Sequence, residues 1–251
     1  MKKLIETSDF FDYSKLSHNL EKYRKHGVVT FKSVLSTALC DDILNDLSSF
    51  NFEKQAKLNS HFLIKKDKSK ILQISPIINL SSNVKYVIEN DIFTSIISNY
   101  LKADKSIIFR DKAIFKPPST GHFLVHQDYS WWHPYPANSM CTVIMSLCDC
   151  TVEHGPVQFY EGTHSTVLLP RGERRTLTAK EIKLAIHEKT THTTTLSKGD
   201  ITLFHPLALH WSPSNISTTS RPFLYIGYID AIYKDAYRNQ LSIQVQRLSK
   251  I

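Results

Sequence analysis

The sequence of 251 residues contains 41% hydrophobic and 11% aromatic residues, which excludes disordered, collagen-like and other fibrous classes. Its formal net charge of +8 favours an anionic partner, either nucleic acid or a carboxylated or phosphorylated small molecule, and charge alone does not choose between them. We find neither an apolar run of about 18 residues nor a signal peptide, so we expect a cytoplasmic protein without a membrane segment.

Nothing in the chain marks a second domain, because we find no internal repeat, low-complexity tract or Gly/Ser linker. We therefore expect one domain over residues 1–251, with a helical N-terminal part at about 8–104 and a β core at about 105–230. The cysteines form no C-x-x-C pair, which disfavours a zinc ribbon or a disulfide scaffold and is typical of small buried hydrophobic residues. They are Cys40, Cys141, Cys148 and Cys150. A monomer and a homodimer are both compatible with these features.

The first hundred residues are predicted to be mainly helical, because their apolar residues recur at helical spacing. Gly27 ends the first helix and is followed by a short β-branched strand over 28–31, and Ser36 could cap the second helix. The apolar stripes consist of Leu16, Leu20 and Tyr23; of Leu39, Ile43, Leu44 and Leu47; and of Ile92, Phe93, Ile96, Ile97, Tyr100 and Leu101.

From about Ser106 the sequence changes to short runs rich in Ile, Val, Phe, Thr and Tyr, separated by turn signals such as Lys198-Gly199-Asp200. These runs predict strands, interrupted by one short helix over 178–187 that begins with a capping-box pattern. The expected fold is mainly β with flanking helices, either a β-barrel or a double-sheet jelly roll whose mouth can hold a small ligand.

A histidine and an aspartate two residues apart, His126 and Asp128, project from the same face of an extended backbone. Together with a second histidine from elsewhere in the fold, they form the 2-His-1-carboxylate triad that binds Fe(II) and leaves positions open for a co-substrate and oxygen. Taken alone, the pair is a weak signal, because a chain with twelve histidines contains H-x-D easily by chance.

The second histidine is predicted to be His210 rather than His205. Along the strand that follows the 198–200 turn, His210 and Ser212 share one face, whereas His205 has the opposite parity. Arg221 follows His210 by eleven residues and begins a strand that can run beside it. We therefore choose His126, Asp128 and His210 as the metal ligands.

Arg221 is the predicted anchor for a co-substrate carboxylate, because a guanidinium inside a β domain needs an anionic partner. A fork of two parallel hydrogen bonds would hold one carboxylate of 2-oxoglutarate and leave its keto-acid end free for the metal. Ser212 could add a hydroxyl donor. Lys112 and Lys116 share a strand face and either could reach a carboxylate, although solvent-facing lysines are equally compatible with the pattern.

These residues together resemble the phytanoyl-CoA dioxygenase family of 2-oxoglutarate-dependent hydroxylases, and the likeness covers most of the chain. The similar segments are His126-Gln127-Asp128, His210-Trp211-Ser212, Arg221, Tyr23 to Val29, Glu153-His154-Gly155-Pro156 and Glu161-Gly162-Thr163-His164. The resemblance implies a double-stranded β-helix of the cupin-like kind, with Fe(II), 2-oxoglutarate and O2, and succinate and CO2 as by-products. Gln127 is retained as a co-substrate contact, although strand alternation points it away from the metal.

The aromatic stretch from Tyr129 to His133 is similar to that of the ectoine hydroxylases in this family, but we do not carry their substrate over. Trp131, Trp132 and His133 are candidate substrate contacts, and for the two tryptophans packing is the equally weighted alternative. His122 and His154 are left outside the metal shell. His164 is interpreted as a structural turn residue, even though Arg175 follows it at the same spacing of eleven.

The predicted activity is hydroxylation of an unactivated C–H bond in a small or medium metabolite. Desaturation or ring closure is possible on the same chemistry, and Asp128 argues against a halogenase, which needs room for chloride. A non-catalytic barrel that binds an anion or nucleic acid and a zinc hydrolase are the rival classes, and neither explains both the triad and Arg221. Basic residues in the expected substrate loops, 51–70 and 169–190, favour an anionic substrate, and nucleic acid is disfavoured.

Overall fold

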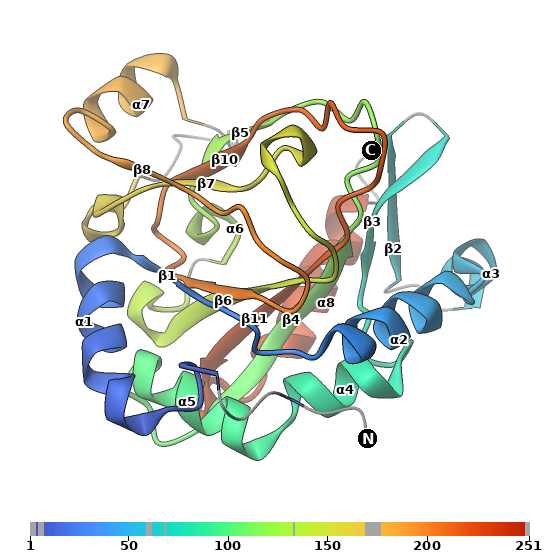
Figure 1. The fold of residues 1–251 in the computed structure, drawn as a ribbon, viewed down its shortest axis with the longest axis horizontal. Coiled ribbons are helices and arrows are strands. Elements are labelled where there is room, and N and C mark those ends of the chain that lie inside the picture. Colours follow the sequence, from blue (N-terminus) through green and yellow to red (C-terminus); the bar gives the residue numbers. More distant parts are fainter. Residues whose placement is uncertain are drawn as a thin grey trace.

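A computed structural model of the chain describes residues 4, 8–58, 62–67, 69–132, 134–168 and 177–248. Within these residues the strands form two antiparallel sheets, and Figure 1 shows the smaller sheet above the larger one. The larger sheet has the order β1-β9-β6-β11-β4-β3-β2 and the smaller one the order β5-β10-β7-β8. The strands are β1 Val28–Phe31, β2 Leu63–Asp67, β3 Lys70–Ser75, β4 Ser106–Ile114, β5 Phe123–His126, β6 Met140–Ser146, β7 Gln158–Tyr160, β8 Thr191–Thr193, β9 Ile201–Phe204, β10 His210–Ser212 and β11 Phe223–Asp230.

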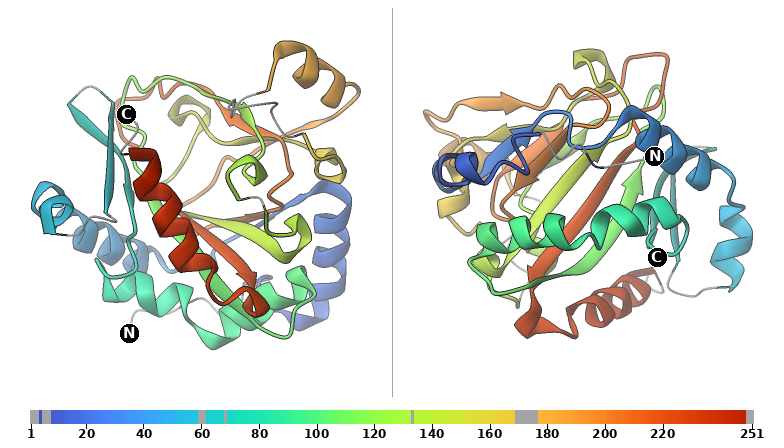
Figure 2. Two further views of the ribbon diagram at one scale, coloured as in Figure 1. Left: turned by 180° about the vertical axis from the view of Figure 1, so that it is seen from behind. Right: turned by 60° about the horizontal axis from the view of Figure 1, so that its bottom comes forward.

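Helices surround the larger sheet on its outer face and edges. The α-helices are α1 Leu16–His26, α2 Thr37–Ser48, α3 Phe52–Leu58, α4 Ser82–Ile88, α5 Asp91–Leu101, α6 Tyr129–Trp132, α7 Ala179–Ala185 and α8 Ala236–Leu248. Single 3-10 turns lie at Tyr13–Lys15, Ala137–Ser139, Val152–His154, Thr163–Ser165 and Ala231–Tyr233. Figure 2 shows α4 and α5 along one side of the sheet and α8 beside β4. None of the helices in the described part of the chain has the length and apolar composition that crossing a lipid bilayer would require.

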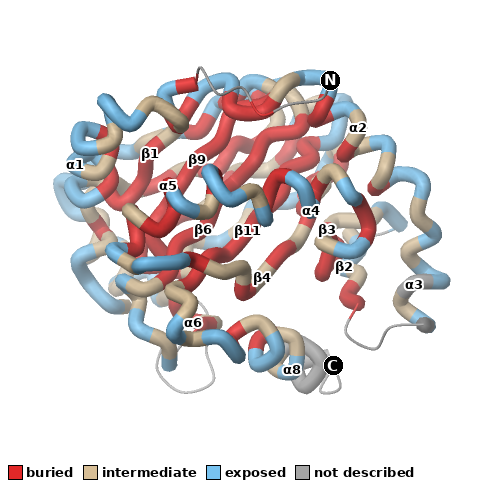
Figure 3. Tube along the Cα trace, turned by 90° about the horizontal axis from the view of Figure 1, so that it is seen from below, coloured by how far each residue is buried: buried red, intermediate tan, exposed pale blue. Residues whose placement is uncertain are grey.

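The larger sheet contains the main core. Every residue of β6 is buried, because helices cover one face of this central strand and the smaller sheet faces the other. Figure 3 shows the buried strands beneath α4 and α5. Such double coverage explains why the sequence of β6 is a continuous apolar run, in which Cys141 is buried like its neighbours. Cys150 is also buried, whereas Cys148 is half-exposed.

The predicted double-sheet jelly roll is confirmed, and among the described residues the two sheets stay separate rather than closing into a barrel. The predicted N-terminal helices are present, and the Ser36 hydroxyl caps α2 by accepting a hydrogen bond of 3.2 Å from the Leu39 amide. One detail differs. In addition to β1, which is the predicted strand over 28–31, the N-terminal part also contributes β2 and β3 to the larger sheet, and the β2–β3 hairpin begins where we expected a substrate loop.

Asp111 fixes the orientation of β4 with respect to the site. It is buried, and its carboxylate accepts hydrogen bonds from the Ile77 and Ile78 amides and from the Tyr237 hydroxyl of α8, at 2.5, 2.6 and 2.8 Å. These contacts hold Asp111 on the outer, helix-covered face of the sheet. The neighbouring side chains on β4, Arg110 and Lys112, therefore point to the inner face, toward the smaller sheet.

Candidate metal centre and co-substrate pocket

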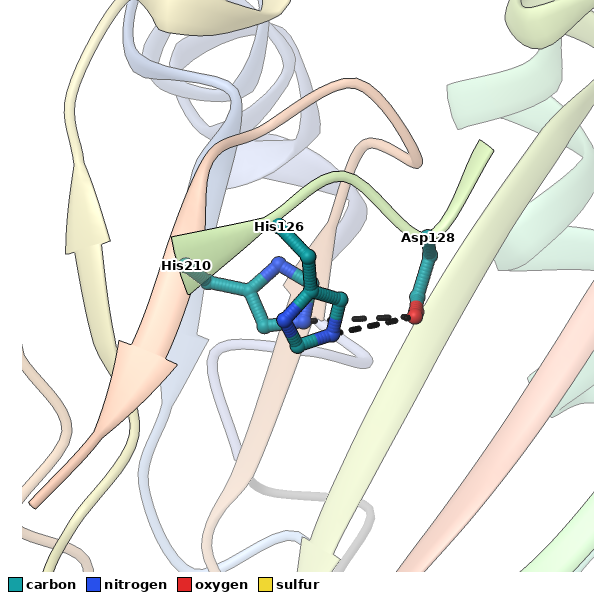
Figure 4. Close-up of side chains that lie close together, drawn as sticks. All are labelled: His126, Asp128 and His210. Carbon is teal, nitrogen blue, oxygen red and sulfur yellow. Dashed lines mark ion pairs between the residues drawn. The ribbon is translucent and has the colours of Figure 1, made fainter. Parts of the chain in front are cut away.

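Two histidines lie opposite each other on neighbouring strands of the smaller sheet. His210 begins β10 and pairs with His126 at the end of β5, and the two imidazole centroids are 4.2 Å apart. Asp128 follows in the turn between β5 and α6. Figure 4 shows that the carboxylate of Asp128 and both imidazoles point toward one position.

The spacing of these three side chains suits a metal ion. Nε2 of His126 is 3.7 Å and Nε2 of His210 is 4.0 Å from Oδ1 of Asp128, and one potential ligand atom from each residue lies within 4.8 Å of the others. The side chains are 20%, 9% and 13% exposed for His126, His210 and Asp128, so the position is shielded but still reachable from solvent. Two imidazole nitrogens and one carboxylate are a donor set that iron(II) accepts.

Backbone carbonyls fix the tautomers of both histidines. Nδ1 of His126 is 2.7 Å from the Leu124 carbonyl oxygen, and Nδ1 of His210 is 2.9 Å from the Ala208 carbonyl oxygen. A carbonyl oxygen only accepts, so both Nδ1 atoms carry the proton and donate it. The lone pairs are consequently on the Nε2 atoms that face Asp128, which is the arrangement that a metal ligand requires.

Burial keeps the ligands in their metal-binding protonation states. Burial, followed by the neighbouring His210, lowers the pKa of His126 to about 4, and burial also lowers the pKa of His210. For Asp128, burial acts to raise the pKa, but the nearby His210, Lys112, His126 and Arg110 outweigh it, and the pKa is lowered. The site therefore presents two neutral imidazoles and a carboxylate at neutral pH.

A cavity of about 420 Å³ opens beside the triad, which is large enough for a small metabolite and a co-substrate. Trp131 stands at its edge, with its ring perpendicular to His126 and the ring centroids 5.2 Å apart. The lining residues are Lys65, Gln73, Arg110, Lys112, Ile114, His122, Phe123, Leu124, His126, Asp128, Trp131, Val157, His210, Trp211, Ser212 and Tyr225.

Arg221 lies directly behind the cavity wall and is fully buried. Its Nη2 donates to the Tyr225 hydroxyl at 3.4 Å, its Nη1 donates to the Gly155 carbonyl, and its guanidinium lies 4.5 Å above the centroid of the Phe223 ring. Nε of Arg221 has no hydrogen-bond partner among the described residues. A buried guanidinium with an unused donor and no carboxylate partner in the described chain fits an anionic ligand.

Lys116 is a second buried cation at this end of the cavity. Its Nζ donates to the Ser212 hydroxyl at 2.6 Å and to the Pro213 carbonyl. Burial, followed by the proximity of Arg221, lowers the pKa of Lys116 to about 7. Because Ser212 and Tyr225 line the cavity and contact Lys116 and Arg221 respectively, a carboxylate at this end would meet two hydroxyls backed by two cations.

Gly155 makes this arrangement possible. Its φ of +64° is left-handed, and a side chain there would collide with the Pro213 carbonyl oxygen. The carbonyl of Gly155 accepts from both Arg221 and Lys116, so the turn between Thr151 and Pro156 holds the two cations side by side.

Besides Arg221 and Lys116, which lie behind the wall, two described residues expected at the site, Gln127 and Trp132, do not line the cavity. The amide of buried Gln127 donates to the Thr166 and Leu207 carbonyls, each at 2.7 Å, and accepts from the Leu168 amide at 2.8 Å, so it joins loops rather than facing a co-substrate. Trp132 packs perpendicular to Phe109 with centroids 5.1 Å apart, on the far side of α6. His133 lies outside the described residues, as does the 169–176 part of the substrate loop expected at 169–190.

Three other histidines have structural contacts, whereas His122 lines the cavity. His164 contacts the Arg24 carbonyl at 3.0 Å, His205 contacts Asn138 at 3.0 Å, and His154 contacts Thr151 and Thr219 at 2.9 Å each. The structure adds Arg110, Gln73, Lys65 and Tyr225 to the cavity. Arg110 has the same strand parity as Lys112, but parity alone does not tell which face of the strand lines a cavity.

Comparison with known proteins agrees with this geometry. A family model described as phytanoyl-CoA dioxygenase matches residues 23–223. A curated relative, the 2-aminoethylphosphonate dioxygenase of an uncultured bacterium, HF130_AEPn_1, is 23% identical over 212 residues, which cover 82% of this chain and 79% of the relative.

Solved structures share the fold at low identity. EctD from S. alaskensis, solved with 2-oxoglutarate and 5-hydroxyectoine, superposes with a TM-score of 0.75 at 16% identity, over 86% of this chain and 76% of EctD. The epimerase SnoN, solved with Fe3+, alpha ketoglutarate and nogalamycin RO, superposes with a TM-score of 0.69 at 17% identity, over 88% of this chain and 85% of SnoN.

Proposed function

This chain belongs to the phytanoyl-CoA dioxygenase family and is a 2-oxoglutarate-dependent oxygenase, and we propose that it hydroxylates an unactivated C–H bond of a small-molecule substrate. The observation that carries the proposal is the pairing of a 2-His-1-carboxylate set with a buried arginine beside one cavity. The triad alone would also suit a zinc hydrolase, but such an enzyme has no use for Arg221.

His126, Asp128 and His210 would hold the iron through two Nε2 atoms and one carboxylate oxygen. When bound, iron and 2-oxoglutarate supply the oxidative chemistry, in which 2-oxoglutarate is converted to succinate and CO2. The protein orients both, and its Nδ1 hydrogen bonds to Leu124 and Ala208 keep the imidazoles aimed before the metal arrives.

The remote carboxylate of 2-oxoglutarate would bind at the Ser212 and Tyr225 end of the cavity. Ser212 would donate its hydroxyl, Arg221 would supply its unused Nε donor and its charge, and Lys116 would add a second charge through Ser212. Phe123 and Val157, which line the same cavity, would exclude water from the chain of methylene groups.

The proposal also specifies which type of product the oxidation gives. Hydroxylation, ring closure and epimerisation can all begin from hydrogen abstraction, and SnoN is an epimerase of the same fold. Halogenation is not proposed, because Asp128 occupies the position that a halide would need. Replacing Asp128 with glycine should eliminate hydroxylation, and full activity in that variant would show that another carboxylate binds the metal.

The test is anaerobic addition of Fe(II) and then 2-oxoglutarate, followed by the weak visible charge-transfer absorption of the complex. Turnover is then measured as succinate released on exposure to oxygen in the presence of trial substrates, and product mass separates hydroxylation from ring closure. 2-Aminoethylphosphonate is the first compound to try, because the curated relative is named for it. A protein that binds Fe(II) but gives no absorption change with 2-oxoglutarate would contradict the proposed function.

A further inference from the structure

A row of cationic and polar side chains forms the wall of the cavity contributed by the larger sheet. Arg110 and Lys112 project inward from β4, on the opposite face from Asp111. In the register of the sheet, Gln73 on β3 lies opposite Ile114 of β4, and Lys65 on β2 lies opposite Gln73. Arg110, Lys112, Gln73, Lys65 and Ile114 all line the cavity. The proposed co-substrate pocket uses none of the four polar side chains in this group.

Two of these side chains have unused hydrogen-bond donors. Nε of Arg110 and Nε2 of Gln73 are buried, and neither has a hydrogen-bond partner in the described part of the chain. Gln73 is only 7% exposed. Leaving such donors unsatisfied is costly, so a structure that retains them beside a cavity is suited to a ligand that accepts hydrogen bonds.

The charges at the site do not balance without a further anion. Asp128 and one 2-oxoglutarate carboxylate together match the charge of iron(II), and the other carboxylate matches Arg221. Arg110, Lys112 and Lys116 then remain. Asp128 acts electrostatically on Arg110 and Lys112, and Asp111 on the opposite face of β4 also acts on Arg110. Lys112 contacts the Tyr225 ring, with Nζ 5.1 Å from its centroid, which satisfies a cation only in part.

Burial and the neighbouring cation both disfavour the charged form of Lys112. The pKa of Lys112 is lowered to about 7. Burial is the largest cause, and the positive charge of the adjacent Arg110 is the next. Gly227 lies opposite Arg110 on β11 and contributes no side chain at this position. Two buried cations on one strand face repel each other, and an anion between them would remove that repulsion.

We infer that Arg110, Lys112 and Gln73 bind an anionic group of the substrate and thereby set substrate specificity. This inference rests on the proposed function. It assigns the Ser212 and Tyr225 end of the cavity to 2-oxoglutarate and the β3–β4 wall to the substrate. The substrate class is a small molecule that carries a carboxylate or a phosphonate, whose oxygens accept from the arginine, the lysine and the glutamine amide.

The experiment uses the Fe(II)- and 2-oxoglutarate-loaded protein without oxygen. Three probes of similar size are titrated: propionate, ethylphosphonate and the uncharged propionamide. Binding is followed by the visible absorption of the complex and by the midpoint of thermal unfolding. The proteins are wild type, Arg110→Met, Lys112→Met, the charge-conserving Arg110→Lys, and Arg24→Gln as a control for loss of an exposed arginine.

We expect propionate or ethylphosphonate, and not propionamide, to bind to wild type and to Arg24→Gln. Anion affinity should fall about 10- to 100-fold in Arg110→Met and in Lys112→Met and recover in part in Arg110→Lys. The affinity for 2-oxoglutarate should change by less than about threefold in all variants, which also shows that they are folded. The stronger of the two anions identifies the source of the charge as carboxylate or phosphonate.

Three results would overturn the inference: equal binding of propionamide and propionate, wild-type anion affinity in Arg110→Met, or a loss of 2-oxoglutarate affinity in that variant. The last would place the wall in the co-substrate site. Failure of the proposed function is separate, because it would appear as wild-type protein that does not bind 2-oxoglutarate at all. If the wild-type protein binds 2-oxoglutarate but neither anion, only the inference is overturned and the proposed function stands.

Discussion

His126 and His210 are direct partners in the antiparallel β5–β10 pair, although 84 positions separate them in the sequence (210 − 126 = 84). Their register shifts between His210 and Ser212, where the ladder is irregular. His210 and Ser212, between which the irregularity lies, both line the cavity. Main-chain pairing of two strands therefore holds the imidazoles in place before a metal binds, so the site costs little reorganisation.

Replacing either histidine with alanine should remove metal binding. His126→Ala and His210→Ala each delete one of three ligands, and we expect Fe(II) affinity to fall by more than about 100-fold, since even loss of residues supporting the ligands costs about 10- to 100-fold. Anaerobic titration with Fe(II) measures this. His18, exposed on α1, provides the matched control His18→Ala. Wild-type Fe(II) affinity in both triad variants would show that the metal is bound elsewhere.

Replacing Arg221 should weaken 2-oxoglutarate rather than iron. A charged, bidentate hydrogen bond contributes roughly 1.5 to 3 kcal/mol, and an unpaired buried charge raises the loss to about 3 to 5 kcal/mol. Arg221→Ala should therefore lower 2-oxoglutarate affinity about a hundredfold or more, and Arg221→Lys should recover part of it. Anaerobic titration of the iron-loaded variants tests this, with Arg24→Ala as control. Unchanged affinity would point to Lys112 or Lys116 instead.

The clustering of the three candidate metal ligands could be predicted because strand parity and ligand chemistry agree. His126 and Asp128 follow from alternation and the preference of iron(II) for this donor set. His210 is chosen over His205 because Arg221 follows it by eleven residues.

Strand parity could not have decided between Trp131 and Trp132. Parity assumes an extended chain, but these residues form the short helix α6, in which successive side chains diverge by about 100°. One ring therefore faces His126 and the other packs on Phe109.

Arg110 was missed for a different reason. Basic residues are spread along the whole chain, so nothing local separates a cavity arginine from one in solvent. Its role becomes visible only when the sheet register places Gln73 and Lys65 beside β4. The β2–β3 hairpin was likewise missed, because its strands contain exposed lysines at the edge of the sheet and lack a continuous apolar pattern.

The low pKa of Lys116 should make stability increase with pH. Its pKa is about 7 in the folded protein, whereas an unfolded lysine titrates near 10.4. Between these values the unfolded chain binds more protons, so the free energy of unfolding rises as pH increases, by at most about 1.4 kcal/mol per pH unit for one group. Below about pH 7 both states are protonated and the dependence disappears.

The measurement is urea unfolding of metal-free wild type and Lys116→Met from about pH 6 to about pH 9. The difference in unfolding free energy, wild type minus variant, should be flat at the acid end and rise above about pH 7. Lys105→Met removes an exposed lysine and should show no such rise. A flat difference for Lys116→Met over the whole range would mean that Lys116 titrates normally.

Variants of Gln127, the middle residue of the H-x-D motif, can show whether it has a structural role or contacts the co-substrate. Its side chain satisfies the Thr166 and Leu207 carbonyls and the Leu168 amide, which ties the turn after β5 to two other loops. Gln127→Leu keeps a similar size but leaves these groups without that partner, and we expect a loss of about 2 to 4 kcal/mol in unfolding free energy. The affinity for 2-oxoglutarate should stay within about threefold of wild type.

Urea unfolding and anaerobic 2-oxoglutarate titration of the same sample separate the two roles. Gln158→Leu is the control, because Gln158 is a half-buried glutamine on β7 with no side-chain hydrogen bond among the described residues. Gln127→Glu refines the test. This variant keeps the acceptor for the Leu168 amide but turns a carboxylate toward two carbonyl oxygens. The free energy of unfolding should therefore fall at neutral pH, and it should fall less at a pH where the carboxylate is protonated. If Gln127→Leu instead kept its stability and lost 2-oxoglutarate affinity, Gln127 would be the co-substrate contact retained in the sequence analysis.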